Sequence, residues 1–130
     1  MLLKSREKPI IFSQILLHLD YIRDKRQEHY VVLTHDSAMN VINKHLVFLG
    51  TVSSTISHPR EIFAVAIADS ASYIIISHNH PSGDVTPSDD DIKATQQFVA
   101  AGIIIGIPLK DHVIMAKEEH FSFASNGMLH

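Results

Sequence analysis

The sequence predicts an α/β fold in which helices flank a mixed central β-sheet. Segments with a helical period of apolar residues alternate with β-branched runs, in the order α-β-β-α-β-α-β-β. The run SYIIISHNH is continuously apolar before its polar end, which is typical of a central strand covered on both faces. Strands also follow one another directly at two places in the chain, so a mixed sheet is favoured over a purely parallel one.

The N-terminal part predicts a helix from Ile10 to about Lys25, because apolar residues recur at helical spacing from Ile11 to Ile22. The charged string RDKRQE closes it and indicates a solvated helix end; a phosphate-binding cluster is the less favoured alternative. Charged residues interrupt the apolar start MLLKSREKPIIF, and no small-residue cleavage site follows. We therefore expect mature sequence of a cytoplasmic protein.

Two strands are expected next. EHYVVLTHD, from Glu28 to Asp36, is rich in β-branched and aromatic residues and predicts the first. The second is predicted from Asn40 to Val52, with a bulge or bend around Asn43-Lys44 and Gly50 near its far end.

The second half alternates helices and strands. Pro59 opens a helix, REIFAVAIADS, which precedes the apolar run SYIIISHNH. Ser88 begins a further helix that reaches about Ala101, with Gly102 as its C-terminal stop. The runs IPLKDHVIMA and HFSFA predict the last two strands.

Composition narrows the function classes. The 130 residues fit one domain, 45% hydrophobic content supports a core, and no apolar run approaches the roughly 20 residues of a membrane helix. A formal charge of −3 gives no general basic footprint, so we expect no autonomous binding of nucleic acid. Cysteine is absent, which excludes disulfides, cysteine zinc sites and thiol nucleophiles and leaves His, Asp and Glu as metal ligands.

The stretch HNHPSGDVTPSDDD carries the strongest chemical signal. His78 and His80 are two residues apart at the end of a predicted strand, so both side chains point to one face and Asn79 to the other. Two imidazoles at one strand end are placed to share a cation. For these two histidines alone, a polar strand end without a ligand is an equally good interpretation.

The acidic helix start that follows strengthens the metal interpretation. Ser88 can cap the helix, and Asp89, Asp90 and Asp91 suit the positive end of the helix dipole. The Pro- and Gly-containing loop before Ser88 could fold this helix start back over the two histidines. The two histidines and one aspartate then form a three-ligand zinc set with a fourth position open for water, although the spacing alone does not exclude another divalent metal.

The spacing His78-x-His80, seven residues, Ser88, two residues, Asp91 resembles the JAMM (MPN/JAB) metalloprotease motif. Together with GTV…HPREIF and GIPLKDHVI, it makes the chain similar to the RadC-type JAB domain. The resemblance implies a cytidine-deaminase-like three-layer architecture and a single domain over residues 1–130. Its core is expected at about residues 28–129 after an N-terminal helix, without the helix-hairpin-helix region of full-length relatives.

The resemblance also implies roles for individual residues. His78, His80 and Asp91 would bind one zinc ion per chain. Ser88 would steady a tetrahedral intermediate through its hydroxyl while also capping the helix. An upstream glutamate would be the general base. Glu28, at the junction of the first helix and first strand, is the favoured candidate, and Glu61 in HPREIF is the alternative.

Other polar residues receive weaker expectations. Asp111 and His112 match the DH pair of the family and should face opposite sides of a strand, so they should not bind one ion together. His112 could support a ligand, contact substrate or be structural, and Asn79 is a further candidate for the cleft or its supporting shell. No role is expected for His35. The remaining expectations concern His58 and Arg60, which should pair with carboxylates of the chain, Asp36, a turn residue, and Ser82, which should stabilise the PSG turn.

The function expected from these features is a zinc-dependent hydrolase of the JAMM type that cleaves peptide or isopeptide bonds of an unidentified substrate. The alternative is a DNA-associated RadC-like accessory or interaction domain without catalysis, since the family carries a DNA-repair label. A deaminase is excluded because the PCxxC zinc ligands are absent. Exposed sheet edges could support a homodimer, and no membrane association is expected.

Overall fold

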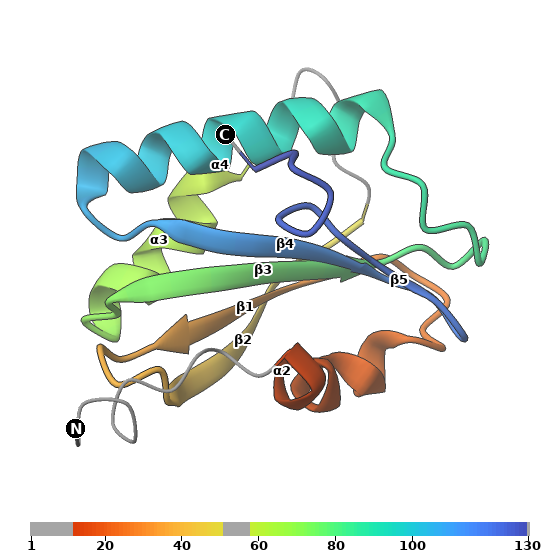
Figure 1. Ribbon diagram of the computed structural model, residues 1–130, viewed down its shortest axis with the longest axis horizontal. Coiled ribbons are helices and arrows are strands. Elements are labelled where there is room, and N and C mark those ends of the chain that lie inside the picture. Colours follow the sequence, from red (N-terminus) through yellow and green to blue (C-terminus); the bar gives the residue numbers. More distant parts are fainter. Residues whose placement is uncertain (1–11, 51–57, 130) are drawn as a thin grey trace.

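The structure, a computed structural model, describes residues 12–50 and 58–129 (Figure 1). The elements in chain order are α2 (Phe12–Leu19), the 3₁₀ helix η1 (Asp20–Ile22), β1 (His29–His35), β2 (Val41–Leu49), α3 (Pro59–Ala68), β3 (Tyr73–Asn79), α4 (Asp89–Ile105), β4 (Leu109–Met115) and β5 (His120–Ser122). The predicted α/β class is confirmed. No helix in these two ranges is long and apolar enough to cross a membrane.

The five strands form one sheet in the order β2-β1-β3-β4-β5, and the prediction of a mixed sheet is confirmed. β1 pairs antiparallel with both β2 and β3, β3 pairs parallel with β4, and β4 pairs antiparallel with β5. The parallel pair requires a crossover connection, and α4 provides it. β2 and β5 form the edges of the described sheet, and the expectation of a homodimer through an edge stays a prediction.

Helices cover both faces of the sheet, which gives three layers (Figure 1). Alternate strand residues such as Tyr30, Val32 and Ile76 pack under α3 and α4, where Phe98 is fully buried. The residues between them, such as Val31, Leu33 and Ile75, pack against Ile15, Leu19 and Ile22 of α2 and η1. β3 is buried along its whole length, so the predicted central strand is confirmed.

Two predicted helix ends are wrong. α4 continues past Gly102 to Ile105, and Gly106 ends it in the left-handed conformation with φ 85°. Gly102 serves packing instead, because a Cβ there would lie 2.7 Å from the carbonyl oxygen of Ile107. The first helix ends at Leu19 and continues only as the short η1 to Ile22, not to Lys25. Its predicted start at Ile10 lies outside the described residues.

The second strand is confirmed from Val41 to Leu49, and residues 51 and 52 of the prediction lie outside the described ranges. The pairing of β2 with β1 shifts in register at two places. One shift lies opposite the step from Tyr30 to Val31 in β1, and the other lies opposite the step from Thr34 to His35. The predicted irregularity around Asn43-Lys44 is confirmed in part, because these two residues pair regularly but one register shift falls at the residue just before Asn43. The irregularities lie on either side of them.

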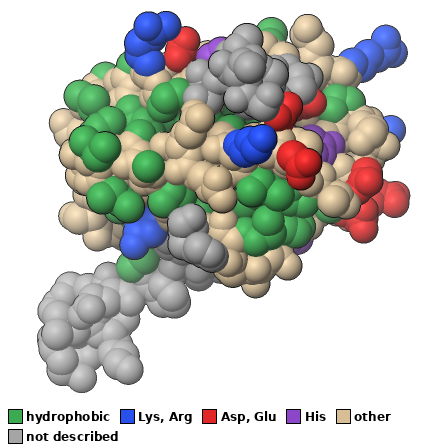
Figure 2. Space-filling model, turned by 90° about the horizontal axis from the view of Figure 1, so that it is seen from above, with side chains coloured by type: hydrophobic (Ala, Val, Ile, Leu, Met, Phe, Trp, Pro, Cys, Tyr) green, Lys and Arg blue, Asp and Glu red, His purple; other side chains and the backbone are tan. Residues whose placement is uncertain are grey.

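The surface over α4 is divided in its chemistry. Hydrophobic side chains gather at the left of Figure 2, where α4 ends, and Ile103 and Ile104 in its last turn are 73% and 85% exposed. Acidic and histidine side chains lie toward the right. The polar end of this surface is the end at which α4 begins, beside the carboxyl end of β3.

Candidate metal centre

The carboxyl end of β3 places two imidazoles side by side. His78 lies inside the strand and is fully buried, and His80 is the first residue beyond it. The Nε2 atoms of the two rings are 3.1 Å apart. Asn79 points to the other face, where its amide contacts the chain before β1. The predicted same-face arrangement of the histidines is therefore confirmed.

The first turn of α4 brings a carboxylate to these rings. Ser88 caps the helix: its Oγ accepts from the Asp91 N–H, and the Asp91 carboxylate accepts from the Ser88 N–H, both at 3.0 Å. The same carboxylate reaches Nε2 of His78 with one oxygen at 3.3 Å and Nε2 of His80 with the other at 3.1 Å. Asp91 is buried, whereas Asp89 is exposed. Of the three aspartates, Asp91 is therefore the one that contacts the two histidines.

A second carboxylate joins the site from the segment just before β1. Donor atoms of Glu28, His78 and His80 all lie within 4.8 Å of one another. Glu28, His80 and Asp91 line an open cavity of about 280 Å³, together with Ser88 and the Pro81-Ser82 turn. The other candidate, Glu61, lies at the start of α3 and contacts His58 at 3.6 Å. The fold thus brings Glu28, and not Glu61, to the two histidines.

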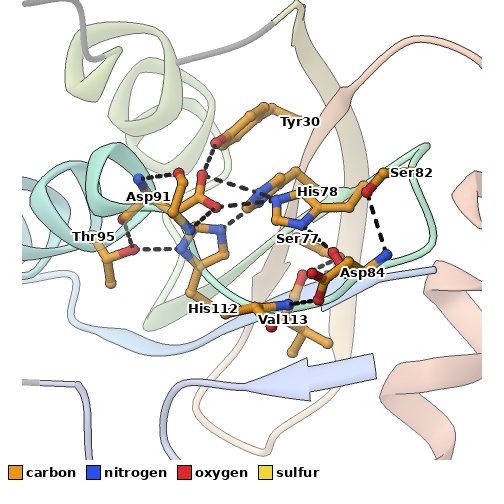
Figure 3. Close-up of polar contacts among 12 residues, drawn as sticks. Tyr30, Ser77, His78, Ser82, Asp84, Asp91, Thr95, His112 and Val113 are labelled. Atoms are coloured by element: carbon orange, nitrogen blue, oxygen red, sulfur yellow. Dashed lines mark hydrogen bonds and ion pairs between the residues drawn. The ribbon is translucent and has the colours of Figure 1, made fainter. Parts of the chain in front are cut away.

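Hydrogen bonds determine which ring nitrogen of His78 carries the proton and which has a lone pair (Figure 3). The Thr95 hydroxyl donates to the Asp91 carbonyl at 2.7 Å, so it must accept from Nδ1–H of His112 at 2.6 Å. His112 is fully buried, and burial lowers its pKa well below the usual value, so its ring is neutral and Nε2 is an acceptor. Nε2 of His112 therefore accepts from Nδ1–H of His78 at 2.8 Å. The Nε2 lone pair of His78 points into the site.

His80 is oriented in the same way by the loop that follows it. Its Nδ1 donates to the Asp84 carbonyl at 2.8 Å, because a carbonyl can only accept. The Nε2 atoms of His78 and His80 thus converge with the Asp91 carboxylate on one point. Three electron-rich groups at this spacing require a cation, which is a proton or a metal ion.

The charge balance agrees with this requirement. Burial lowers the pKa of His80, but its hydrogen bonds to Asp91 and to the Asp84 carbonyl outweigh burial and raise the pKa above its usual value. Burial would raise the pKa of Asp91, yet its contacts with the rings of His78 and His80 and with the Ser88 N–H hold it well below its usual range. Asp91 is therefore ionised at neutral pH, as a metal ligand must be.

The donor set suits a divalent metal ion such as zinc. A tetrahedral ion bound at about 2.0–2.1 Å holds its ligand atoms about 3.3 Å from one another. The Nε2 atoms of His78 and His80 are 3.1 Å apart, close to this spacing, and Asp91 approaches His78 with Oδ1 at 3.3 Å and His80 with Oδ2 at 3.1 Å. Nitrogen and carboxylate ligands suit zinc among several divalent ions, and the side toward Glu28 and the cavity leaves a fourth position accessible.

Two residues around this centre were missed by the sequence analysis. Tyr30 stacks on His78 with ring centroids 4.4 Å apart and planes 1° apart, and its hydroxyl lies 3.5 Å from Asp91. Thr95 orients His112. Their signals were present in the sequence: Thr95 is one helical turn beyond Asp91, and Tyr30 is two residues beyond Glu28 in a strand that pairs with β3 at His78.

Asn79 and Asp111 support the site from the opposite face of the sheet. The Asn79 amide donates to the carbonyls of Lys25 and Gln27 at 3.1 and 3.0 Å and accepts from the His29 N–H at 2.6 Å. Asn79 therefore fixes the segment that carries Glu28 and does not line the cavity. The Asp111 side chain points away from the His112 ring, as expected, and accepts from the His112 N–H at 2.7 Å and from the Ser122 hydroxyl at 2.6 Å.

The remaining expectations concern residues outside the centre. His58 and Arg60 both pair with Glu61, at 3.6 and 3.8 Å, as predicted. Asp36 accepts from backbone N–H groups of its own turn, and Ser82 accepts from the N–H of residue 84, so both local roles are confirmed. His35 is buried against Tyr73, away from the centre.

Comparisons with known proteins agree with the arrangement. The family model described as RadC-like JAB domain matches residues 12–128. UPF0758 proteins of Staphylococcus aureus, from strains bovine RF122 / ET3-1 and Newman, are each 46% identical over 106 residues, which is 82% of this chain and 46% of each relative. A UPF0758 protein of Chlorobium chlorochromatii is 46% identical over 108 residues, 83% of this chain and 49% of the relative. The chain spans about half the length of these curated relatives.

Proposed function

Because this chain belongs to the RadC-like JAB domain family, we propose that it is a zinc-dependent hydrolase that cleaves peptide or isopeptide bonds. One observation carries the proposal. Two imidazole Nε2 atoms 3.1 Å apart and an ionised carboxylate that reaches both of them converge beside a second carboxylate on an open cavity.

His78, His80 and Asp91 would hold the zinc ion. Zinc in such a site supplies an activated water, whose pKa it lowers to about 7, and polarises the carbonyl of the substrate. Three protein ligands leave room for water and substrate, and a hydrolytic site needs that room.

Glu28 would move the proton. Its carboxylate lies beside both histidines at the cavity, in a position to accept a proton from the attacking water. The same carboxyl group would then deliver that proton to the leaving nitrogen. Asn79 positions Glu28 indirectly, because it holds the carbonyl of residue 27 and the N–H of residue 29.

Ser88 would stabilise the oxyanion that forms when the carbonyl is attacked. Its Oγ accepts the capping hydrogen bond from Asp91, so its own hydroxyl proton remains for donation into the cavity that it lines. A donor aimed at a developing oxyanion typically contributes about 10²–10³ in kcat. The cap holds this hydroxyl in place.

The test compares Glu28→Gln with Glu61→Gln in zinc content and in hydrolysis of quenched fluorescent peptide libraries. Glu28→Gln should keep zinc and lose about 10²–10⁴ in turnover, the usual contribution of a general base. Glu61→Gln is the matched control and should keep both properties, because Glu61 lies away from the centre. Equal turnover of wild type and Glu28→Gln would overturn the assignment, and a wild type that takes up no transition metal from zinc-containing buffer would overturn the function.

A further inference from the structure

A second pocket, of about 370 Å³, lies beside the metal centre and is basic. Arg23, Lys25, Arg26 and Lys117 line it, against a single acidic residue, Asp24. The whole chain, by contrast, carries a formal charge of −3. The pocket is therefore a local concentration of positive charge on an acidic protein, and it is suited to an anionic group.

The walls of the basic pocket come from three segments that meet at one end of the sheet: the η1–β1 connection, the turn after β3 and the β4–β5 turn (Figure 1). Arg23 ties the first segment to the third, since its Nη1 donates to the carbonyls of Ala116 and Glu119 at 2.6 and 3.0 Å. Its Nε also pairs with Asp20 at 2.7 Å. Arg23 is thus occupied in structure, and the cations available to a ligand are the other three.

Those three cations stand on fixed backbone. Asn79 holds the backbone of the first segment in place, because its amide donates to the carbonyls of Lys25 and Gln27. The bonds from Arg23 do the same for the turn that bears Lys117. Lys25, Arg26 and Lys117 are all exposed, so their ammonium and guanidinium groups can be reached by a ligand without rearrangement of the chain.

The basic pocket is continuous with the cavity of the metal centre. Both are lined by His80, Pro81 and Ser82, so the Pro81-Ser82 turn is their common rim. Figure 3 shows Ser82 on the loop that leaves the metal centre. A chain whose scissile bond lies at Glu28 and His80 can continue over this rim into the basic pocket.

The chemistry of the lining favours a carboxylate over a nucleic acid. Among the described residues that line the basic pocket there is no Phe, Tyr or Trp, so it lacks the large aromatic side chains on which sites for single-stranded nucleic acid usually stack bases. Three flexible cations around a small pocket suit one or two carboxylates. An acidic side chain of a peptide is such a ligand.

We propose that Lys25, Arg26 and Lys117 form a specificity subsite that binds an acidic side chain of the substrate, next to the bond that is cleaved. The proposal rests on the hydrolase function above, because it names the substrate class of that same site. It assigns these residues to substrate binding and not to catalysis.

The test measures binding and cleavage separately. Binding is measured by fluorescence anisotropy on zinc-loaded Glu28→Gln protein, with fluorescein-labelled peptide pools that differ in Glu against Gln at two fixed neighbouring positions. The Glu pool should bind about three- to tenfold more tightly, the range expected from a few exposed charge pairs, and the preference should shrink with added salt. Lys25→Glu combined with Lys117→Glu should abolish or reverse it, and the neutral Lys25→Gln with Lys117→Gln should reduce it.

Lys110→Glu is the matched control for charge reversal. Lys110 is exposed and lies over Tyr73, at the end of β3 opposite to the metal centre. The control should keep the full preference for the Glu pool. An equal preference in wild type and in the Lys25→Glu, Lys117→Glu protein would overturn the proposal, as would tighter binding of oligo-dT of the same charge through the same lysines.

Cleavage of the unlabelled pools by the wild type, read by mass spectrometry, separates the two hypotheses. Cleaved sites enriched in Asp or Glu on one side of the bond support the subsite. Cleavage without such enrichment leaves the hydrolase standing and overturns the subsite. Lysine-dependent binding of the Glu pool without any cleavage would support the subsite and contradict the hydrolase.

Discussion

Two fully buried histidines lie at opposite ends of the central sheet and differ in one respect. His78 stacks on Tyr30 at 4.4 Å, and His35 stacks on Tyr73 at 4.5 Å, both with nearly parallel rings. Both nitrogens of His78 have partners, whereas neither nitrogen of His35, nor the Tyr73 hydroxyl, has a hydrogen-bond partner within the structure described.

The comparison separates what burial does from what hydrogen bonding does. Burial lowers the pKa of His35, opposed by the nearby Leu33 backbone, and keeps the ring neutral, but no described side chain fixes its tautomer as His112 does for His78. At the other end, Thr95 and His112 select the tautomer of His78 and aim its Nε2 lone pair at His80 and Asp91. Stacking and burial alone give a neutral ring in the core, and the hydrogen-bond chain adds the fixed tautomer and direction that a metal ligand would need.

The largest expected effect comes from the carboxylate that completes the site. Asp91→Ala should remove zinc binding, and with it a zinc-dependent stabilisation of about 2.7 kcal/mol at a zinc concentration 100 times the wild-type dissociation constant. It should also cost roughly 1 kcal/mol through the lost helix cap. Thermal melting with and without zinc measures both effects.

Asp89→Ala is the matched control, two residues earlier in the same helical turn. Asp89 is exposed and should contribute only through the helix dipole, so the zinc-dependent rise in melting temperature should remain. A similar loss in both variants would mean that the acidic turn, and not Asp91 itself, binds the metal.

The next effect tests the chain that orients His78. Thr95→Val leaves Nδ1–H of His112 without its acceptor, so zinc affinity should fall about 10–100-fold, as for other groups that orient metal ligands. Competition with a fluorescent zinc chelator measures the affinity. Thr34→Val removes a buried hydroxyl that contacts Asp69 at 2.7 Å, away from the centre, and should leave zinc affinity unchanged.

A smaller effect of opposite sign is expected at the other end of the sheet. His35→Phe replaces a ring with two unpartnered nitrogens by an apolar ring that can keep the stack on Tyr73. The free energy of unfolding in urea should stay the same or rise by about 1 kcal/mol. His112→Phe should instead lower it by about 1–3 kcal/mol, since it leaves partners of His112 unpaired. An equal loss of unfolding free energy in His35→Phe and His112→Phe would contradict the claim that hydrogen-bond partners distinguish these histidines.

The smallest effect is a pH dependence of stability. Burial lowers the pKa of folded His35 below its usual 6.5, so the unfolded chain binds the proton more readily. The stability linked to this group is present above about pH 6.5 and is lost as pH falls toward the folded pKa. Urea unfolding between pH 7.5 and 5.5 should show a shallower loss for His35→Phe than for the wild type. If the free energy of unfolding depended on pH equally in His35→Phe and in the wild type, a group other than His35 would be responsible for the dependence.

The sequence predicted the parts of this account that depend on local spacing. Alternation placed His78 and His80 on one face, and capping signals located the start of α4 at Ser88. The predicted end of α4 was wrong, because Gly102 is required for close packing against the Ile107 backbone and not for ending the helix. That packing exists only in the folded chain. Tyr30, Thr95 and the partners of Asn79 were missed for the same reason: their roles depend on strand pairing and helix packing between segments distant in sequence.

The most direct test of the central claim is a ¹⁵N–¹H correlation spectrum of the histidine side chains, recorded with and without one equivalent of zinc. The Nε2 resonances of His78 and His80 should move to metal-bound positions while Nδ1 of both rings stays protonated. His35, at the far end of the sheet, should not change. Metal-bound positions at Nδ1 of either ring, metal-bound positions at histidines other than His78 and His80, or no metal-bound nitrogen at all would contradict the claim that His78, His80 and Asp91 form a metal centre.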